Sequence, residues 1–351
     1  MSKRITLLFS IAVCSLMVAA NLTAQTEVPG PVFRPLQAES QGATDPLVQP
    51  FIFDYDTQMF APLDISDVAD RKAKSGFFFT YDRVYTSIGR PDPIGPGAPA
   101  QHPRGTDYQW GNRYNAGFFG DNDKGFQFEY TTVTGSFFSA GTDPTVPDPF
   151  LTETKLDVFE MNRIFRQHLS NGSYLEPYFG VRYTSISDNT VEDTTFFVGA
   201  TEIPNRFTQN ATNSAVGAQI GARYITHRGR WTIRTDSSIM AGYNTQRYRA
   251  GDIQQTPGTT FPTIFEQTTE ASSFLPTVDL QMDLAYHLTR DIALRTTFGV
   301  LYMWEGVNRA NTTTTSLNPN SVLSGGAAGA FGTSSQDFFS AGFGFGIEWR
   351  R

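Results

Sequence analysis

The chain has 351 residues, with 27 Lys and Arg against 34 Asp and Glu, so its formal net charge is −7. This acidic balance argues against a nucleic-acid partner. Charged residues make up only 17% of the chain, below the usual ~25%, while 30 Phe, 14 Tyr and 4 Trp stand among 31 Gly and 20 Pro, which favours strands over helices. A single cysteine excludes an internal disulfide framework and a Cys-based zinc site.

Residues 1–24 are typical of an export signal. Lys3 and Arg4 give a positively charged start, and an apolar stretch of about 16 residues ends at Ala20. Small residues allow cleavage after Ala20 or Ala24. A membrane anchor is the alternative, but so short a stretch followed at once by small residues favours a removed signal. The mature chain is therefore predicted to be exported and to lack the cysteine.

The next segment, residues 25–74, is polar and punctuated by proline, which predicts a flexible periplasmic extension. From residue 75 to 351 the pattern changes to alternation with a period of two. It is clearest from Phe274 to Tyr286, where the even-numbered positions are apolar and most odd-numbered ones are polar. Such alternation continues for ~13–16 residues in a segment, whereas a tilted strand crosses a bilayer in ~9–11. Residues 75–351 are therefore predicted to form an all-β, antiparallel transmembrane β-barrel.

The alternation predicts about ten strands, within a range of eight to twelve. They cover residues 75–88, 108–120, 125–134, 152–167, 173–187, 212–226, 230–246, 272–288, 291–307 and 337–350. Short connections at residues 121–124, 170–172, 227–229 and 289–290 alternate with long polar ones that begin at residues 89, 135, 188, 247 and 308. Short periplasmic turns and long extracellular loops are typical of bacterial outer-membrane barrels, which places both termini in the periplasm.

The last strand carries a recognisable ending. Gly344, Ile347 and Trp349 resemble the Gly-x-x-apolar-x-aromatic end by which outer-membrane barrels are recognised for assembly. This resemblance implies the barrel assembly machinery and outer-membrane lipid as partners. Segments 157–163, 175–183, 217–224 and 229–231 resemble the putative beta-barrel porins of planctomycetes, a likeness that covers residues 75–351 and implies location in a bacterial outer membrane.

If the apolar positions face lipid, the opposite positions line the interior. The charged residues among them are Arg113, Glu129, Glu160, Glu176, Arg182, Arg223, Arg234, Asp236, Asp279, Asp283, Arg295, Glu305 and Glu348. Folding the hairpins about their turns pairs Glu160 with Arg182 and sets Arg223 opposite Arg234. The hypothesis is a mixed-sign lumen cluster made of Glu160, Arg182, Arg223, Arg234, Asp236, Asp283 and Arg295.

Two positions fit the barrel pattern badly. Arg83 shares the lipid-facing parity of Tyr81 and Tyr85, where a mid-bilayer arginine costs roughly 2–4 kcal/mol, so a bulge or an interfacial position is expected. The apolar parity also changes between Leu156 and Phe159, which predicts a second local irregularity.

The lumen cluster has two interpretations, an ion-selective constriction or a salt-bridged filling. Ten strands are close to the small barrels that side chains fill, so a closed barrel is favoured. We expect Arg234→Ala to raise conductance and lower thermal stability together. The predicted role is passive, in porin-like passage of small solutes or as a structural surface protein, and the alternative is an adhesion module acting through its loops.

An enzyme is the third hypothesis. Only four histidines are present, and His102 alone is predicted on the extracellular side. No catalytic residue, cofactor site or metal ligand is predicted, because no nucleophile motif or metal-ligand spacing occurs.

Overall fold

The computed structural model describes residues 75–89, 106–139, 150–170, 172–198, 201–254, 263–310 and 335–350. The predicted export signal (1–24) and periplasmic extension (25–74) lie outside these residues, as does His102. No helix in the described part of the chain has the length and hydropathy needed to span a membrane.

Ten long strands and one short strand make up the described chain. They are β1 (Gly76–Gly89), β2 (Thr106–Phe119), β3 (Lys124–Ser139), β4 (Phe150–Phe165), β5 (Gln167–His168), β6 (Tyr174–Val198), β7 (Thr201–Arg228), β8 (Trp231–Gln254), β9 (Thr263–His287), β10 (Ile292–Asn308) and β11 (Ser335–Arg350).

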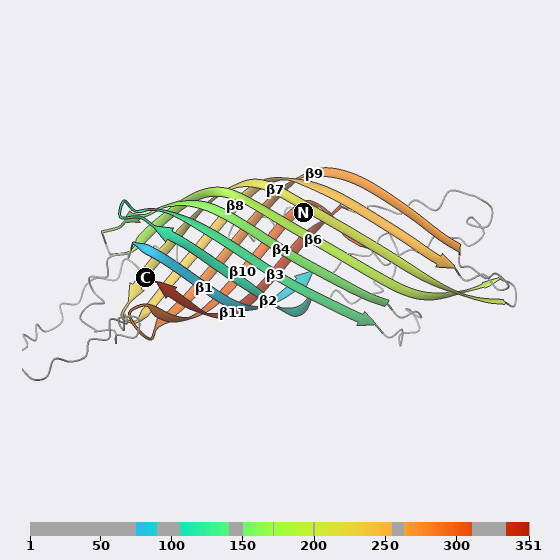
Figure 1. Cartoon of the computed structure of the whole chain (residues 1–351), viewed down its shortest axis with the longest axis horizontal. Helices are drawn as coiled ribbons and strands as arrows, with labels where there is room; N and C mark the ends of the chain where they lie inside the picture. Colours follow the sequence, from blue (N-terminus) through green and yellow to red (C-terminus); the bar gives the residue numbers. More distant parts are fainter. Residues whose placement is uncertain are drawn as a thin grey trace, which may run out of the picture.

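The sheet closes on itself. Its order is β4-β3-β2-β1-β11-β10-β9-β8-β7-β6-β5, and β4 also pairs with β6, so every long strand has two antiparallel neighbours. The two-residue β5 continues the line of β4 beside β6. Figure 1 shows the strands running obliquely and side by side around the barrel. The predicted all-β antiparallel barrel is confirmed.

A row of aromatic side chains in register marks the outer wall. The residues that neighbouring strands pair in succession are all exposed or partly exposed, and all are aromatic except Val216: Tyr81, Tyr114, Tyr130, Phe159, Tyr183, Val216, Tyr243 and Phe274. Two residues further from the short turns, the corresponding row is polar: Arg83, Asn112, Thr132, Asp157, Ser185, Ser214, Thr245 and Ser272. An apolar belt bordered by aromatic rings is the surface that a bilayer requires.

Arg83 lies in this polar row, and the register on both sides of it is continuous, so the expected bulge is absent. Its Nη1 donates to Asn112 Oδ1 at 2.8 Å, and its guanidinium lies 5.6 Å from the centre of the Trp110 ring. Both contacts offset the cost of an outward-facing cation beside the aromatic row.

The long connections predicted from residues 188 and 247 are wrong. The β6–β7 ladder continues past Asp188 to Val198↔Thr201, and the β8–β9 ladder continues to Gln254↔Thr263. In Figure 1 these four strands reach beyond the others at one end of the barrel. Beyond the bilayer neither face has to be apolar, so the alternation ends although Thr and Val residues still favour strand.

Orientation in the membrane gives a testable prediction. Epitope tags inserted within residues 140–149 or 311–334 should be reachable by antibody on intact cells, because these segments join strands at the end opposite the short turns. A tag after Gly172, at a short turn, should be reachable only after the outer membrane is permeabilised. Surface labelling of the Gly172 tag with the other two silent would reverse the orientation.

Candidate functional site

The interior contains an ion-pair network that crosses the barrel. Glu160 of β4 lies opposite Arg182 of β6, as the sequence register predicted, with 2.6 Å between Oε1 and Nη2. Arg182 is only 2% exposed and also donates to Asp279 of β9, on another wall. The second carboxylate oxygen of Glu160 accepts from Gln219 Nε2 of β7 at 2.8 Å. Four strands are thereby tied together through the lumen.

A second network joins the strands at the barrel seam. Asp283 of β9 contacts Arg295 of β10 at 2.8 Å and Arg234 of β8 at 3.5 Å. Arg234 also reaches Glu348 of β11 at 3.2 Å. Asp82 of β1 accepts from Arg113 Nε of β2 at 3.0 Å and lies 3.8 Å from Arg295.

Close packing at the seam depends on glycine in β11. A Cβ on Gly344 would lie 2.4 Å from Thr297 Oγ1, and that hydroxyl accepts from Arg113 Nη2 at 2.6 Å. The inward face of β11 therefore leaves room for a side chain from β2 to reach β10.

A third group of charges lies nearer the short turns, and it corrects one prediction. The register sets Arg223 opposite Asp236, not Arg234, with a 2.8 Å ion pair. The hairpin pairs Arg228 with Trp231, so the turn is Gly229-Arg230, with Gly229 at φ 58°, instead of 227–229. When the turn moves by one residue, the residue opposite Arg223 moves by two, from Arg234 to Asp236. An opposite-charge pair thereby replaces the expected like-charge contact.

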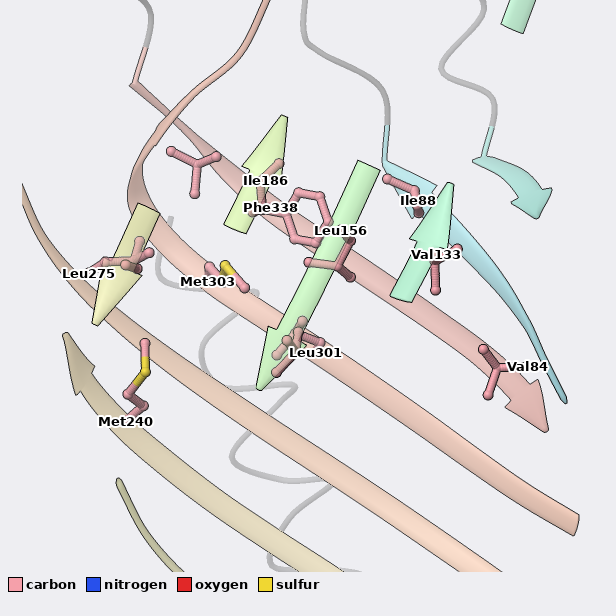
Figure 2. Packing of buried hydrophobic residues seen from close by; sticks show 13 residues of the cluster. Val84, Ile88, Val133, Leu156, Ile186, Met240, Leu275, Leu301, Met303 and Phe338 are labelled. Atoms are coloured by element: carbon pink, nitrogen blue, oxygen red, sulfur yellow. The ribbon is translucent and has the colours of Figure 1, made fainter. Parts of the chain in front are cut away.

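An apolar layer fills the lumen on the far side of these charges. Figure 2 shows its side chains projecting from several strands into one space. It consists of Val84, Ile88, Val133, Leu156, Val158, Ile186, Ala215, Met240, Leu275, Leu301, Met303, Val307 and Phe338. The β3–β4 and β4–β6 registers run unbroken through Leu156 and Phe159, so the predicted irregularity is wrong, and the inward apolar residues there belong to this layer.

The end of β10 folds inward over the apolar layer. The β10–β11 register shifts between Met303 and Val307, and Gly306 has φ 134°, in the region that favours glycine. Gly306 O accepts from Asn244 Nδ2 at 2.6 Å and from Gln246 Nε2 at 2.5 Å. Because of the shift, Glu305 is exposed instead of lining the lumen as predicted.

Arg309 fixes the inward-folded end of β10 and the two residues after it in place; residues 306–310 are called the inward segment below. Arg309 is 2% exposed, forms an ion pair with Asp188 of β6, and donates through Nη2 to Gly89 O of β1 at 3.0 Å. Its guanidinium lies 5.2 Å from the centre of the Phe338 ring in the apolar layer. Asn213 Nδ2 donates a hydrogen bond to Asn308 O at 2.6 Å, and Asn308 N donates one to Asn213 Oδ1 at 2.7 Å.

A cavity of about 90 Å³ separates the charged and apolar layers. Arg182, Glu129 and Glu160 line one part of it, and Val84 and Leu156 line another. This volume accommodates several water molecules, which would solvate the Arg182 Nε and Nη1 groups that lack partners among the described residues.

Residues 153–350 match the family model described as "Putative beta barrel porin-7 (BBP7)". The chain belongs to the BBP7 family. It is an outer-membrane β-barrel protein, as the sequence pattern predicted. No curated protein shows significant similarity to this BBP7 chain.

Solved structures similar to this BBP7 barrel include other membrane barrels. Neisserial surface protein A is 12% identical, with 80% of this chain and 100% of that chain covered and a TM-score of 0.30. The CymD monoaromatic hydrocarbon channel is 6% identical, with 84% and 92% covered and a TM-score of 0.27. The transport unit of the autotransporter AIDA-I from Escherichia coli is 7% identical, with 82% and 96% covered and a TM-score of 0.29.

Sequence reasoning missed four buried interior charges of the BBP7 barrel: Asp82, Arg166, Asp188 and Arg309. Asp82 has the parity opposite to the outward Tyr81 and Tyr85, and Arg166 has the inward parity of Glu160, so parity alone could have found these two. Arg309 follows the register shift in β10, which no sequence signal indicated. Within the described residues, no three His, Cys, Asp or Glu side chains come together as a metal site.

Proposed function

We propose that this protein is a closed outer-membrane barrel with a passive, structural role, which does not let ions through in its resting state. The observation that carries the proposal is the order of layers along the lumen. An ion-paired layer is followed by an apolar layer, and the inward segment held by Arg309 covers the apolar layer.

Each layer opposes conduction for a different reason. The charged layer is closed by ion pairs, which would have to separate before an ion could pass. The apolar layer offers no hydrogen-bond partner, and a hydrophobic constriction blocks ions by excluding water. Because the two barriers lie in series, opening one leaves the other in place.

The test is single-channel conductance in a planar bilayer. Wild-type protein should be silent, and Arg234→Ala alone should lower thermal stability yet stay silent, because the apolar layer remains. The prediction from sequence alone, that this variant conducts, did not include that layer. Combining Arg234→Ala with Met303→Ala and Phe338→Ala should open the barrel. Large, stable wild-type conductance would contradict the proposal and favour porin-like passage of small solutes.

A binding or adhesion role is the second candidate, and the strands that continue beyond the aromatic row favour it. The β6–β7 ladder continues from Asn189↔Asn210 to Val198↔Thr201, which projects a paired sheet from the barrel. Deleting residues 190–209 and joining the shortened strands by a two-residue Asn-Gly turn should leave folding unchanged. If the projection binds a surface partner, cell aggregation or attachment should fall in this variant alone.

No turnover chemistry is part of the proposal. His227 and His287 both hydrogen-bond to Thr232 at 2.8 Å, and His168 contacts Asp123 at 3.3 Å. All three histidines lie at the short-turn end, where these contacts give them a structural role.

A further inference from the structure

An arginine lies halfway across the lipid-facing wall of the barrel. Arg83 is exposed and lies seven positions after Gly76, the short-turn end of β1. Leu280, in the middle of the apolar belt, also lies seven positions from the short-turn end of its strand, His287 of β9. Ser272 belongs to the same row of paired residues as Arg83, yet it lies fifteen positions from His287. The row therefore climbs obliquely around the tilted strands (Figure 1), and Arg83 is at the depth of Leu280.

The surroundings of Arg83 agree with this depth. Exposed aromatic side chains from three neighbouring strands, β1, β2 and β11, surround it on both the short-turn side and the long-loop side. They are Phe79, Tyr85, Trp110, Tyr114 and Phe345. Lipid tails offer no hydrogen-bond acceptor at this depth, so an arginine here is costly unless another group covers it.

Most of the donors of Arg83 are unused. Its Nη1 donates to Asn112 Oδ1 at 2.8 Å, and the same oxygen accepts from the Tyr81 hydroxyl at 3.0 Å. Among the described residues, no carboxylate and no other acceptor contacts this guanidinium. Because the side chain is exposed, the remaining donors can be reached from outside the barrel.

The same wall carries hydroxyl groups that can accept. Tyr114 of β2 is 41% exposed, and its hydroxyl has no hydrogen bond within the described part of the chain. Tyr130 of β3 pairs with Tyr114 in register and is 39% exposed. Its hydroxyl donates to Asp157 Oδ1 at 3.1 Å, which leaves the oxygen lone pairs free to accept. A donor on β1 and acceptors on β2 and β3 thus lie on one surface, called the β1–β3 wall below.

We propose that the β1–β3 wall binds a second copy of this chain within the membrane, around a two-fold axis that runs along the membrane normal at β2. Rotation about the normal leaves depth unchanged, so groups at similar depths meet. The Tyr114 hydroxyls of the two copies face each other at the axis. Arg83 of each copy donates to the Tyr130 hydroxyl of the other.

A second copy fits this surface better than lipid does. It supplies both the donor and the acceptor at the required depth, and lipid tails supply neither. Arginine and aromatic residues are also enriched in protein interfaces. The interface is independent of whether the barrel conducts, because it involves only the outer wall.

Cysteine cross-linking in outer membranes tests the axis. Tyr114→Cys, in a chain that also carries Cys14→Ser, should give a disulfide-linked species of twice the chain mass. The matched control is Ile239→Cys on β8, which is 57% exposed and lies five strands from β2 in either direction around the ten long strands. It should stay monomeric. Equal linkage of the two variants, no linkage of Tyr114→Cys, or linkage to a protein of different mass would each overturn the proposal.

Two further variants test the hydrogen bond across the interface. Arg83→Leu and Tyr130→Phe should each raise the dissociation constant of the dimer about tenfold or more, measured by sedimentation in detergent. Arg83→Leu should still fold in lipid vesicles, because leucine suits a lipid-facing position. Tyr243→Phe on β8, at a side chain that is 61% exposed, is the control and should leave the dimer unchanged.

Native mass spectrometry separates a second copy from bound lipid. Wild-type protein should appear as a dimer, and Arg83→Leu should appear mainly as a monomer. A monomeric wild type in which Arg83→Leu changes only the retained lipid would assign Arg83 to lipid and overturn the proposal. An unchanged dimer in both Arg83→Leu and Tyr130→Phe would equally contradict it.

Discussion

Arg182→Ala should destabilise the barrel by about 3–5 kcal/mol, because removing it leaves the buried Glu160 and the part-buried Asp279 without their counter-charge. Arg182 is 2% exposed and holds both Glu160 and Asp279. The measurement is equilibrium unfolding in urea of protein folded into lipid vesicles.

The control for Arg182→Ala is Arg247→Ala. Arg247 is 64% exposed and lies 3.8 Å from Glu270, so its loss should cost about 0–1 kcal/mol. Combining Arg182→Met with Glu160→Gln and Asp279→Asn should recover much of the lost stability, since no buried charge remains unpaired. Equal costs for Arg182→Ala and Arg247→Ala would mean that the interior network is solvated and the barrel is open to water.

Leu280→Arg should impair folding into lipid by about 2–4 kcal/mol, because it places a cation in the middle of the apolar belt. Leu280 is the central residue of the outward series that runs from Phe274 to Tyr286 on β9. The folding equilibrium in vesicles measures the effect.

Ser272→Arg is the matched control on the same strand and the same face. Ser272 lies in the polar row beyond the aromatic row, where an arginine should cost only about 0–1 kcal/mol. Gln281 is unsuitable as a control because it accepts from Arg113 at 2.6 Å and donates to Asp283 at 2.8 Å. Equal effects at Leu280 and Ser272 would mean that the assigned lipid-facing surface is wrong.

The barrel could be predicted because lipid imposes a strict rule on one face of every strand. Outward positions such as Leu280 and Phe345 must be apolar, so a period of two persists over the whole crossing. Beyond the bilayer that rule no longer applies, and the extra lengths of β6–β9 left no alternation to detect.

The interior was only partly predictable, because it obeys no single rule. The hairpin around Gly172 pairs Glu160 and Arg182 as the sequence suggests, since the register follows from the tight turn. At Gly229 a one-residue difference in the turn changed the partner of Arg223. Leu156 and Val158 resembled an irregularity because an apolar interior gives both faces of a strand similar side chains.

The seam between the first and last strands determines when the barrel can close. β1 pairs with β11 from Phe78↔Arg350 to Ile88↔Ser340, so the partners are more than 250 residues apart in the chain. The logarithmic part of the entropy cost of such a loop is only about 5 kcal/mol, but it is incurred in a single late step. Until β11 arrives, β1 and β10 are unpaired sheet edges that can join other chains. Chaperone protection of these two edges would therefore raise the yield of folded protein more than any change that speeds the earlier hairpins.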